Sequence, residues 1–283
     1  MIQVITDSTA DLPPELAEQE GILVVPCQVT FGEKSFREGV DISGEAFFRR
    51  LRTSPRLPRT ALPRGEDFEA AYREARARGA TGVLAVHLGS RFSGLFNAAR
   101  LVASRTGMPV ELVDSGTASM ALGLLALDAA RLARQGMALS QLAGHVRQLA
   151  PRAETYAMLD TLEYVRRGGR INRVMEMAAT ALRIKPVLRV ARNSVDVVTR
   201  QRTRQRALEW LAHRVTVADE RFGVAVVHAD APELAGTLAR AVGEHLAAGT
   251  ACLRATAGAV LGTHAGPGAV GVCLIRRAPF TSA

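Results

Sequence analysis

Hydroxyl groups, glycines and an arginine gather in the stretch 88–94, which reads Leu-Gly-Ser-Arg-Phe-Ser-Gly. The residues before it, 82–87, are mostly apolar and rich in valine, which predicts a buried strand, and the apolar residues after it recur at helical spacing. The stretch is therefore predicted to be a strand-to-helix loop. Such a loop presents free backbone N–H groups and the positive end of a helix dipole, which together favour an anion. Ser93 is the candidate ligand-binding hydroxyl; the alternative is that it only caps the helix.

Three further side chains have types that suit an anionic ligand. His264 stands among glycines and a proline, which leave its ring open to a ligand; an ordinary hydrogen-bonded loop histidine is the alternative. Arg170 follows Gly168 and Gly169, so its guanidinium is placed to pair with a carboxylate or phosphate, unless it is a surface arginine. Thr60, near two prolines, either donates its hydroxyl to a ligand or satisfies a turn.

Several signatures of enzymes are missing from the sequence. It contains no Gly-Lys pair of a phosphate-binding loop, no G-x-G-x-x-G after a strand and no H-E-x-x-H zinc motif. Ser93 does not lie in a nucleophile elbow, because Arg91 stands where a glycine is needed. A hydrolase that uses Ser93 and His264 stays an alternative, although no carboxylate can be assigned to orient the histidine. No catalytic residue, metal or cofactor is predicted.

The composition fits a globular chain of two ordinary domains, with 283 residues of which 48% are hydrophobic. The net charge is +9, and the basic residues are arginines apart from Lys34 and Lys185. A nucleic-acid-binding protein is therefore an alternative, with the arginines of the segment Arg192–Arg206 tracking phosphates along a strand edge. Against it, arginines lie beside acidic residues on many helix-like segments and only 5% of residues are aromatic.

The sequence favours a cytoplasmic protein. Residues 1–7 lack the basic-then-apolar order of a signal peptide. The longest apolar stretch, 120–130, is too short to span a bilayer and contains Asp128. The three cysteines at positions 27, 252 and 273 have the spacing of neither a disulfide framework nor a zinc site.

The elements that must position the candidate residues alternate between strand and helix in the first half of the chain. Strands are predicted at 2–6, 22–31, 82–87 and 110–113, with helices between and after them. This alternation predicts a parallel sheet covered on both faces, in which ligands bind beyond the carboxyl ends of the strands. The polar segments 7–9, 90–93 and 114–115 all fall at those ends.

The second half is predicted to be mixed α/β. It contains a strand at 155–159, a hairpin of 186–191 and 195–200 across Asn193-Ser194, and later strands at 223–228, 251–256 and 269–275. Helices are predicted at 162–167, 174–182, 204–217 and 232–246, and His264 falls in a glycine-rich loop, 262–268. The predicted fold is thus α/β with two domains: an N-terminal parallel-sheet domain, 1–153, and a C-terminal mixed α/β domain, 154–283.

Residues 5–12, Ile-Thr-Asp-Ser-Thr-Ala-Asp-Leu, resemble the opening of the DegV family. This family comprises bacterial fatty-acid-binding proteins that serve as the lipid-carrying subunit of fatty acid kinase. Further segments match the family in the same order along the whole chain: 87–94, 114–115, 162–164, 167–171, 184–188, 202–204 and 262–271. Each match alone is weak, but their order and their extent make the resemblance specific.

The resemblance implies that one long-chain fatty acid, such as palmitate or oleate, lies in an apolar tunnel between the two domains. Carried over by position, the residues that bind its carboxylate are Thr60, Ala61, Ser93, Arg170 and His264. Ala61 departs from the family, which usually has a hydroxyl side chain there. The chain departs again after Ser93 and Gly94, where Leu95 replaces the usual threonine.

The resemblance also implies a partner. In the family, a dihydroxyacetone-kinase-like fatty acid kinase phosphorylates the carboxylate for phospholipid metabolism, so the chain itself is expected to be a lipid-binding protein rather than an enzyme. Arg202, in the Arg-Thr-Arg segment, is the residue expected to dock this kinase by pairing with its acidic residues.

Overall fold

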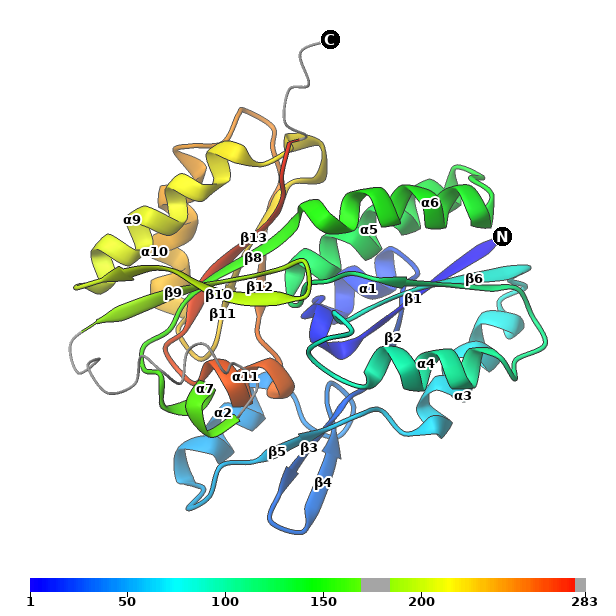
Figure 1. Ribbon diagram of the computed structural model, residues 1–283, viewed down its shortest axis with the longest axis horizontal. Coiled ribbons are helices and arrows are strands. Elements are labelled where there is room, and N and C mark those ends of the chain that lie inside the picture. The colour runs from blue at the N-terminus through cyan, green and yellow to red at the C-terminus, as the bar shows by residue number, and fades with distance from the viewer. Residues whose placement is uncertain (169–183, 278–283) are drawn as a thin grey trace.

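The computed structural model describes residues 1–168 and 184–277, which form three sheets with helices packed around them (Figure 1). The described strands are arranged as a four-stranded parallel sheet in the order β2-β1-β6-β7, a three-stranded antiparallel sheet β4-β3-β5, and a six-stranded mixed sheet β10-β9-β8-β13-β11-β12. The predicted α/β class, with a parallel sheet in the first half and a mixed sheet in the second, is confirmed.

The parallel sheet is buried on both faces. Its strands are β1 (Ile2–Asp7), β2 (Leu23–Val25), β6 (Gly82–His87) and β7 (Val110–Asp114), and every residue of β6 is buried. Side chains alternate across a strand, so Val83 and Ala85 share one core with α3 (Gly65–Ala77) and α4 (Leu95–Ala103). Leu84 and Val86 face the other core, with α5 (Met120–Arg134) and α6 (Leu139–Leu149). The short α1 (Pro14–Gln19) joins β1 to β2.

The single strand predicted at 22–31 is wrong. It is divided at Pro26 into β2 and β3 (Gln28–Phe31), because proline has no N–H to donate to a ladder. β3 leaves the parallel sheet and pairs with β4 (Lys34–Arg37) and β5 (Arg59–Ala61). This small sheet packs on α2 (Gly44–Thr53) through an aromatic contact of 5.7 Å between the ring centres of Phe31 and Phe47.

The mixed sheet has an outer and an inner face. It consists of β8 (Ala153–Met158), β9 (Lys185–Ala191), β10 (Ser194–Gln201), β11 (Val224–His228), β12 (Cys252–Thr256) and β13 (Val270–Ile275). Helices α9 (Arg204–Arg214) and α10 (Pro232–Gly243) cover the outer face, and the inner face looks toward the parallel half (Figure 1). The predicted β9–β10 hairpin is confirmed, but its turn is Arg192-Asn193, both at positive φ, rather than Asn193-Ser194, because Ser194 already pairs with Ala191.

Two short helices lie between the halves: α7 (Glu163–Gly168) and α11 (Ala259–Ala265). The loop predicted at 262–268 is wrong up to Ala265, because α11 includes Gly262 and His264. Glycine is a poor helix former, but here tertiary packing prevails. A Cβ at Gly262 would lie 2.7 Å from the ring of Phe48 and 2.9 Å from that of Phe47 on α2, so only glycine allows this approach. Within the two described ranges, no helix has the length and apolarity needed to cross a membrane.

We therefore expect Gly262→Ala to lower the free energy of unfolding by about 1–3 kcal/mol, because the added methyl group overpacks the contact between α11 and α2. Urea unfolding followed by circular dichroism measures this change. Gly144→Ala is the matched control: Gly144 lies inside α6 with no atom within 4 Å of a built Cβ, so the same substitution should stabilise by about 0.5–1 kcal/mol. Equal effects at both positions would contradict the packing assigned to Gly262.

Candidate functional site

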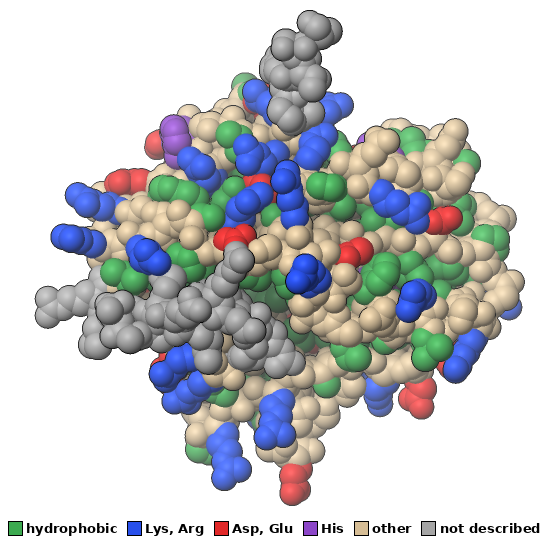
Figure 2. All heavy atoms as spheres, in the orientation of Figure 1, with side chains coloured by type: hydrophobic (Ala, Val, Ile, Leu, Met, Phe, Trp, Pro, Cys, Tyr) green, Lys and Arg blue, Asp and Glu red, His purple; other side chains and the backbone are tan. Residues whose placement is uncertain are grey.

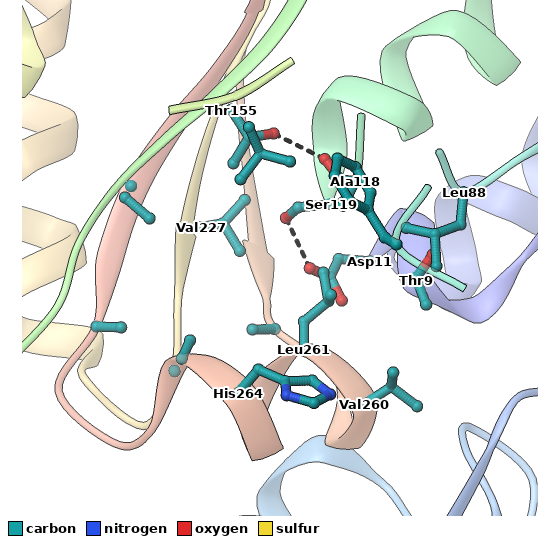
Figure 3. Close-up of a pocket in the computed structure, with 18 of the residues that line it drawn as sticks. Thr9, Asp11, Leu88, Ala118, Ser119, Thr155, Val227, Val260, Leu261 and His264 are labelled. Carbon is teal, nitrogen blue, oxygen red and sulfur yellow. Dashed lines mark hydrogen bonds between the residues drawn. The ribbon is translucent and has the colours of Figure 1, made fainter. Parts of the chain in front are cut away.

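A largely apolar cavity of about 450 Å³ lies between the inner face of the mixed sheet and the carboxyl ends of the parallel strands (Figure 3). Its volume falls within the range of small-molecule sites. Both halves contribute to its wall. The apolar lining side chains include Leu88, Leu95, Ala118, Ala157, Leu159, Leu188, Val190, Val227, Val260 and Leu261.

Four of the candidate residues predicted from the sequence line this one cavity: Thr60, Ala61, Ser93 and His264. Thr60 lies on β5 and His264 on α11, yet the Oγ1 of Thr60 is 3.3 Å from the Nε2 of His264. Leu62 lies beside Gly94, which brings the segment after β5 next to the loop that holds Ser93. Arg170 lies outside the described residues. Arg202 is exposed between β10 and α9 and does not line the cavity.

Ser93 lies on the cavity wall just before α4. Its Oγ accepts a hydrogen bond of 3.2 Å from the N–H of Leu95, the first residue of α4, although the N-cap position itself is Gly94. A hydroxyl that accepts one bond keeps its own hydrogen for another acceptor. Because Ser93 also lines the cavity, that hydrogen can be donated to a bound ligand.

The start of the loop 88–94 is held by Asp7 and His87, a buried pair at the ends of β1 and β6. The Oδ2 of Asp7 lies 3.0 Å from the Nδ1 of His87 and accepts a bond of 2.9 Å from the N–H of Leu88. Burial opposes ionisation of Asp7, but the hydrogen bond and charge of His87, together with bonds from Thr9 and Leu88, outweigh it. The pKa of Asp7 therefore lies below its usual value.

The same loop is also held by the turn of the β9–β10 hairpin. The Oδ1 of Asn193 accepts a bond of 3.2 Å from the N–H of Arg91, while its Nδ2 donates to Asp114 at 2.9 Å. Asp114 in turn accepts from the N–H of Ser90 at 3.0 Å. Sequence reasoning identified Asn193 only as a turn residue, because nothing in its local sequence indicates a contact more than 100 positions away.

Two buried carboxyl groups of the first half hold the start of α11. The N–H of Gly258 donates to Asp11 at 2.8 Å, and the N–H of Val260 donates to Glu38 at 2.7 Å. The first N–H groups of a helix have no partner within it, and a carboxyl group there is favoured by the helix dipole. Glu38 also accepts from the hydroxyl of Ser8. A Cβ on Gly258 would lie 2.3 Å from Glu38, so this approach requires glycine.

Asp11 borders the cavity and is exposed by only 7%. Burial raises its pKa to about 8, although bonds from Gly258 and from the Oγ of Ser119, the latter at 2.7 Å, act in the other direction. Burial likewise raises the pKa of Glu38. Sequence reasoning placed the polar segment 7–9 beyond the end of a strand but singled out neither Asp11 nor Glu38, because their role depends on α11.

The geometry does not favour the two alternative functions. A hydrolase would need Ser93 to give its proton to His264, whereas the Nε2 of His264 faces Thr60. In the segment Arg192–Arg206, the side chain of Arg192 donates to the carbonyl of Pro151, and Arg204 pairs with Asp160 at 2.8 Å. Lys and Arg side chains are spread over the face shown in Figure 2, with acidic side chains among them.

Comparisons with known proteins agree on one family. The model of the DegV family matches residues 1–277. A DegV domain-containing protein of Streptomyces coelicolor is 34% identical over 282 residues, which cover 98% of this chain and 99% of the relative. A second, from Mycobacterium tuberculosis, is 35% identical over 276 residues and covers 96% of each chain.

Two solved structures are similar over nearly the whole chain. One is a DegV family protein from Thermus thermophilus, described for its fatty acid binding, with a TM-score of 0.86 and 29% identity. The other is DegV from Bacillus subtilis, described as a fatty acid binding protein, also with a TM-score of 0.86 and 29% identity. Each comparison covers 98% of this chain and 99% of the relative.

We expect Asp11→Asn to flatten the pH dependence of stability. The folded protein keeps the Asp11 proton up to about pH 8, whereas the unfolded chain releases it near 3.8. The contribution of Asp11 is therefore fully present below that lower value and is lost as pH rises through about 8. Asparagine can accept from Gly258 without ionising, and it tolerates the φ of 51° at this position.

Urea unfolding between about pH 5 and about pH 8 measures this effect. Asp41→Asn is the control, because Arg37 holds the pKa of the Asp41 carboxyl at about 2, so its contribution changes only at lower pH. An Asp11→Asn variant with the pH profile of the parent would contradict the assignment.

Proposed function

Because this chain belongs to the DegV family, we propose that it binds one long-chain fatty acid, such as palmitate or oleate, in the cavity between proposed domains 1–153 and 154–283. The observation that carries the proposal is the cavity itself, whose wall is apolar except for a few polar groups. Burial of an acyl chain there gains about 0.8 kcal/mol per methylene. The fatty acid binding of the Thermus and Bacillus relatives supports the same ligand class.

The carboxylate of the acid is proposed to lie at the part of the cavity wall that Thr60, Ser93 and His264 contribute. Thr60 and Ser93 donate hydroxyl hydrogens to its oxygens, and His264 lies beside Thr60. Ala61 has no hydroxyl to offer, so Thr60 or the backbone has to supply the hydrogen-bond donor at this position. The proposed contribution of Arg170 rests on the family resemblance alone. Few, well-placed polar groups that fix one end of an apolar ligand are typical of such cavities.

We further propose that the bound carboxylate is phosphorylated by a partner, a dihydroxyacetone-kinase-like fatty acid kinase. The sequence has no phosphate-binding loop of its own, so the nucleotide has to come with the partner. When the carboxylate becomes an acyl phosphate it gains negative charge, so cationic groups nearby matter more for the transfer than for holding the acid. Arg202 is exposed and is the proposed docking residue.

The purified protein should release one long-chain fatty acid per chain on denaturing extraction, as measured by mass spectrometry. Ser93→Ala should weaken the binding of labelled palmitate or oleate by about 1–3 kcal/mol, because a buried carboxylate oxygen loses its donor. Ser90→Ala is the matched control: it removes a hydroxyl from the same loop but not from the cavity wall. An empty protein that binds neither acid would refute the proposal; equal binding by both variants would refute only the carboxylate position.

The proposed kinase role predicts a separation between binding and transfer. His264→Ala and Arg202→Ala should lower the rate of acyl-phosphate formation with the cognate kinase while palmitate stays bound. For Arg202→Ala the loss should shrink as salt is raised, since charge pairing mainly governs the encounter rate. A coupled kinase assay beside a binding assay tests each variant, with Arg73→Ala, an exposed arginine on α3, as control. Normal acyl-phosphate formation with both variants would refute the proposed roles of these two residues and leave only the proposed fatty acid binding.

A further inference from the structure

Two of the hydroxyl residues that line the cavity lie away from the proposed carboxylate site. They are Ser119, which precedes α5, and Thr155, on the inner face of β8. Both residues are nearly buried, with exposures of 5% and 8%. Figure 3 places Thr155 and His264 at opposite ends of the drawn cavity, with Ser119 and Asp11 between them. A ligand held at His264 therefore meets these hydroxyls with the middle or far part of its chain.

The hydrogen bonds of Thr155 and Ser119 leave oxygen lone pairs available to a ligand. Thr155 donates its only hydroxyl hydrogen to the carbonyl of Ala118 at 2.7 Å, and its remaining contact is a weak one of 3.4 Å with the thiol of Cys273. Ser119 shares a bond of 2.7 Å with Asp11. A hydroxyl oxygen can accept two bonds, so Thr155 in particular offers an acceptor to a ligand that donates.

Ser119 also has an unusual backbone. Its φ of 59° and ψ of −157° lie in a region that is nearly restricted to glycine, so a serine there is strained. Glycine would relieve the strain but would remove the hydroxyl from the cavity wall. The chain thus places a polar side chain at a costly position on the wall of a largely apolar cavity.

We propose that the cavity accepts long-chain fatty acids that carry a hydroxyl group within the chain, with that hydroxyl donating to the Oγ1 of Thr155 beside Ser119. The inference rests on the proposed function and names its ligand class. Burial of a hydroxyl in a wholly apolar tunnel carries a desolvation penalty, whereas a wall that supplies a hydrogen-bond partner offsets it. Straight-chain acids fit the same space without using this partner.

The test compares stearic acid with monohydroxystearic acids in which the hydroxyl moves along the middle of the chain. The best of these should bind the parent protein at least as tightly as stearic acid does. Thr155→Val keeps the shape of the side chain but removes its oxygen, so it should weaken the best hydroxy acid on the order of tenfold and leave stearic acid unchanged. Thr155→Ser keeps the oxygen, so its affinity for the best hydroxy acid relative to stearic acid should match that of the parent protein.

The corresponding oxostearic acid is a second control. It cannot donate to Thr155, so the parent protein should bind it more weakly than the hydroxy acid; equal binding would overturn the assigned contact. If stearic acid binds but every hydroxy acid binds tenfold or more weakly, the inference fails while the proposed function stands. A Thr155→Val variant that loses both ligands equally would also overturn it. If the parent protein binds no fatty acid, both proposals fail.

Discussion

The cavity depends on the contact between α11 and the two buried carboxyl groups of Asp11 and Glu38. These groups belong to the first half of the chain and accept backbone N–H groups at the start of α11, in the second half. A charged carboxylate in such a buried place is costly, and burial raises the pKa of both groups. Because α11 carries Leu261 and His264, this contact sets one wall of the cavity.

The cavity itself results from small side chains on the inner face of the mixed sheet. Gly271, Cys273 and Ala157 face it from neighbouring strands, where larger residues would fill the space. An apolar void loses dispersion contacts and lowers stability unless something occupies it. The outer face of the same strands, with Tyr156 and Met158, is packed tightly against α9 and α10. The sheet therefore has one face that packs against helices and one that lines the cavity.

Local patterns in the sequence predicted most of the strands and helices, since β6 is a short, mostly apolar run that is buried throughout and buried residues recur at helical spacing along α2. They failed where distant residues decide the structure: α11 forms because Gly262 fits against Phe47 and Phe48, not because glycine favours a helix. Thr60, Ser93 and His264 were singled out because their side chains suit an anionic ligand and stand beside prolines or glycines, and all three line the cavity. Asn193, Asp11 and Glu38 carry no such local signal; their roles arise from contacts across the fold.

The separation of Asp11 and Gly258 along the chain has a consequence for synthesis. Their hydrogen bond joins residues 247 positions apart, and such contacts form only after a large loss of chain entropy. The ribosome must produce nearly the entire polypeptide before α11 can reach its carboxyl partners. Until then, a nascent chain whose parallel sheet has folded lacks the contact of α11 with Asp11 and Glu38. The wall of the cavity that α11 forms is therefore added only near the end of biosynthesis.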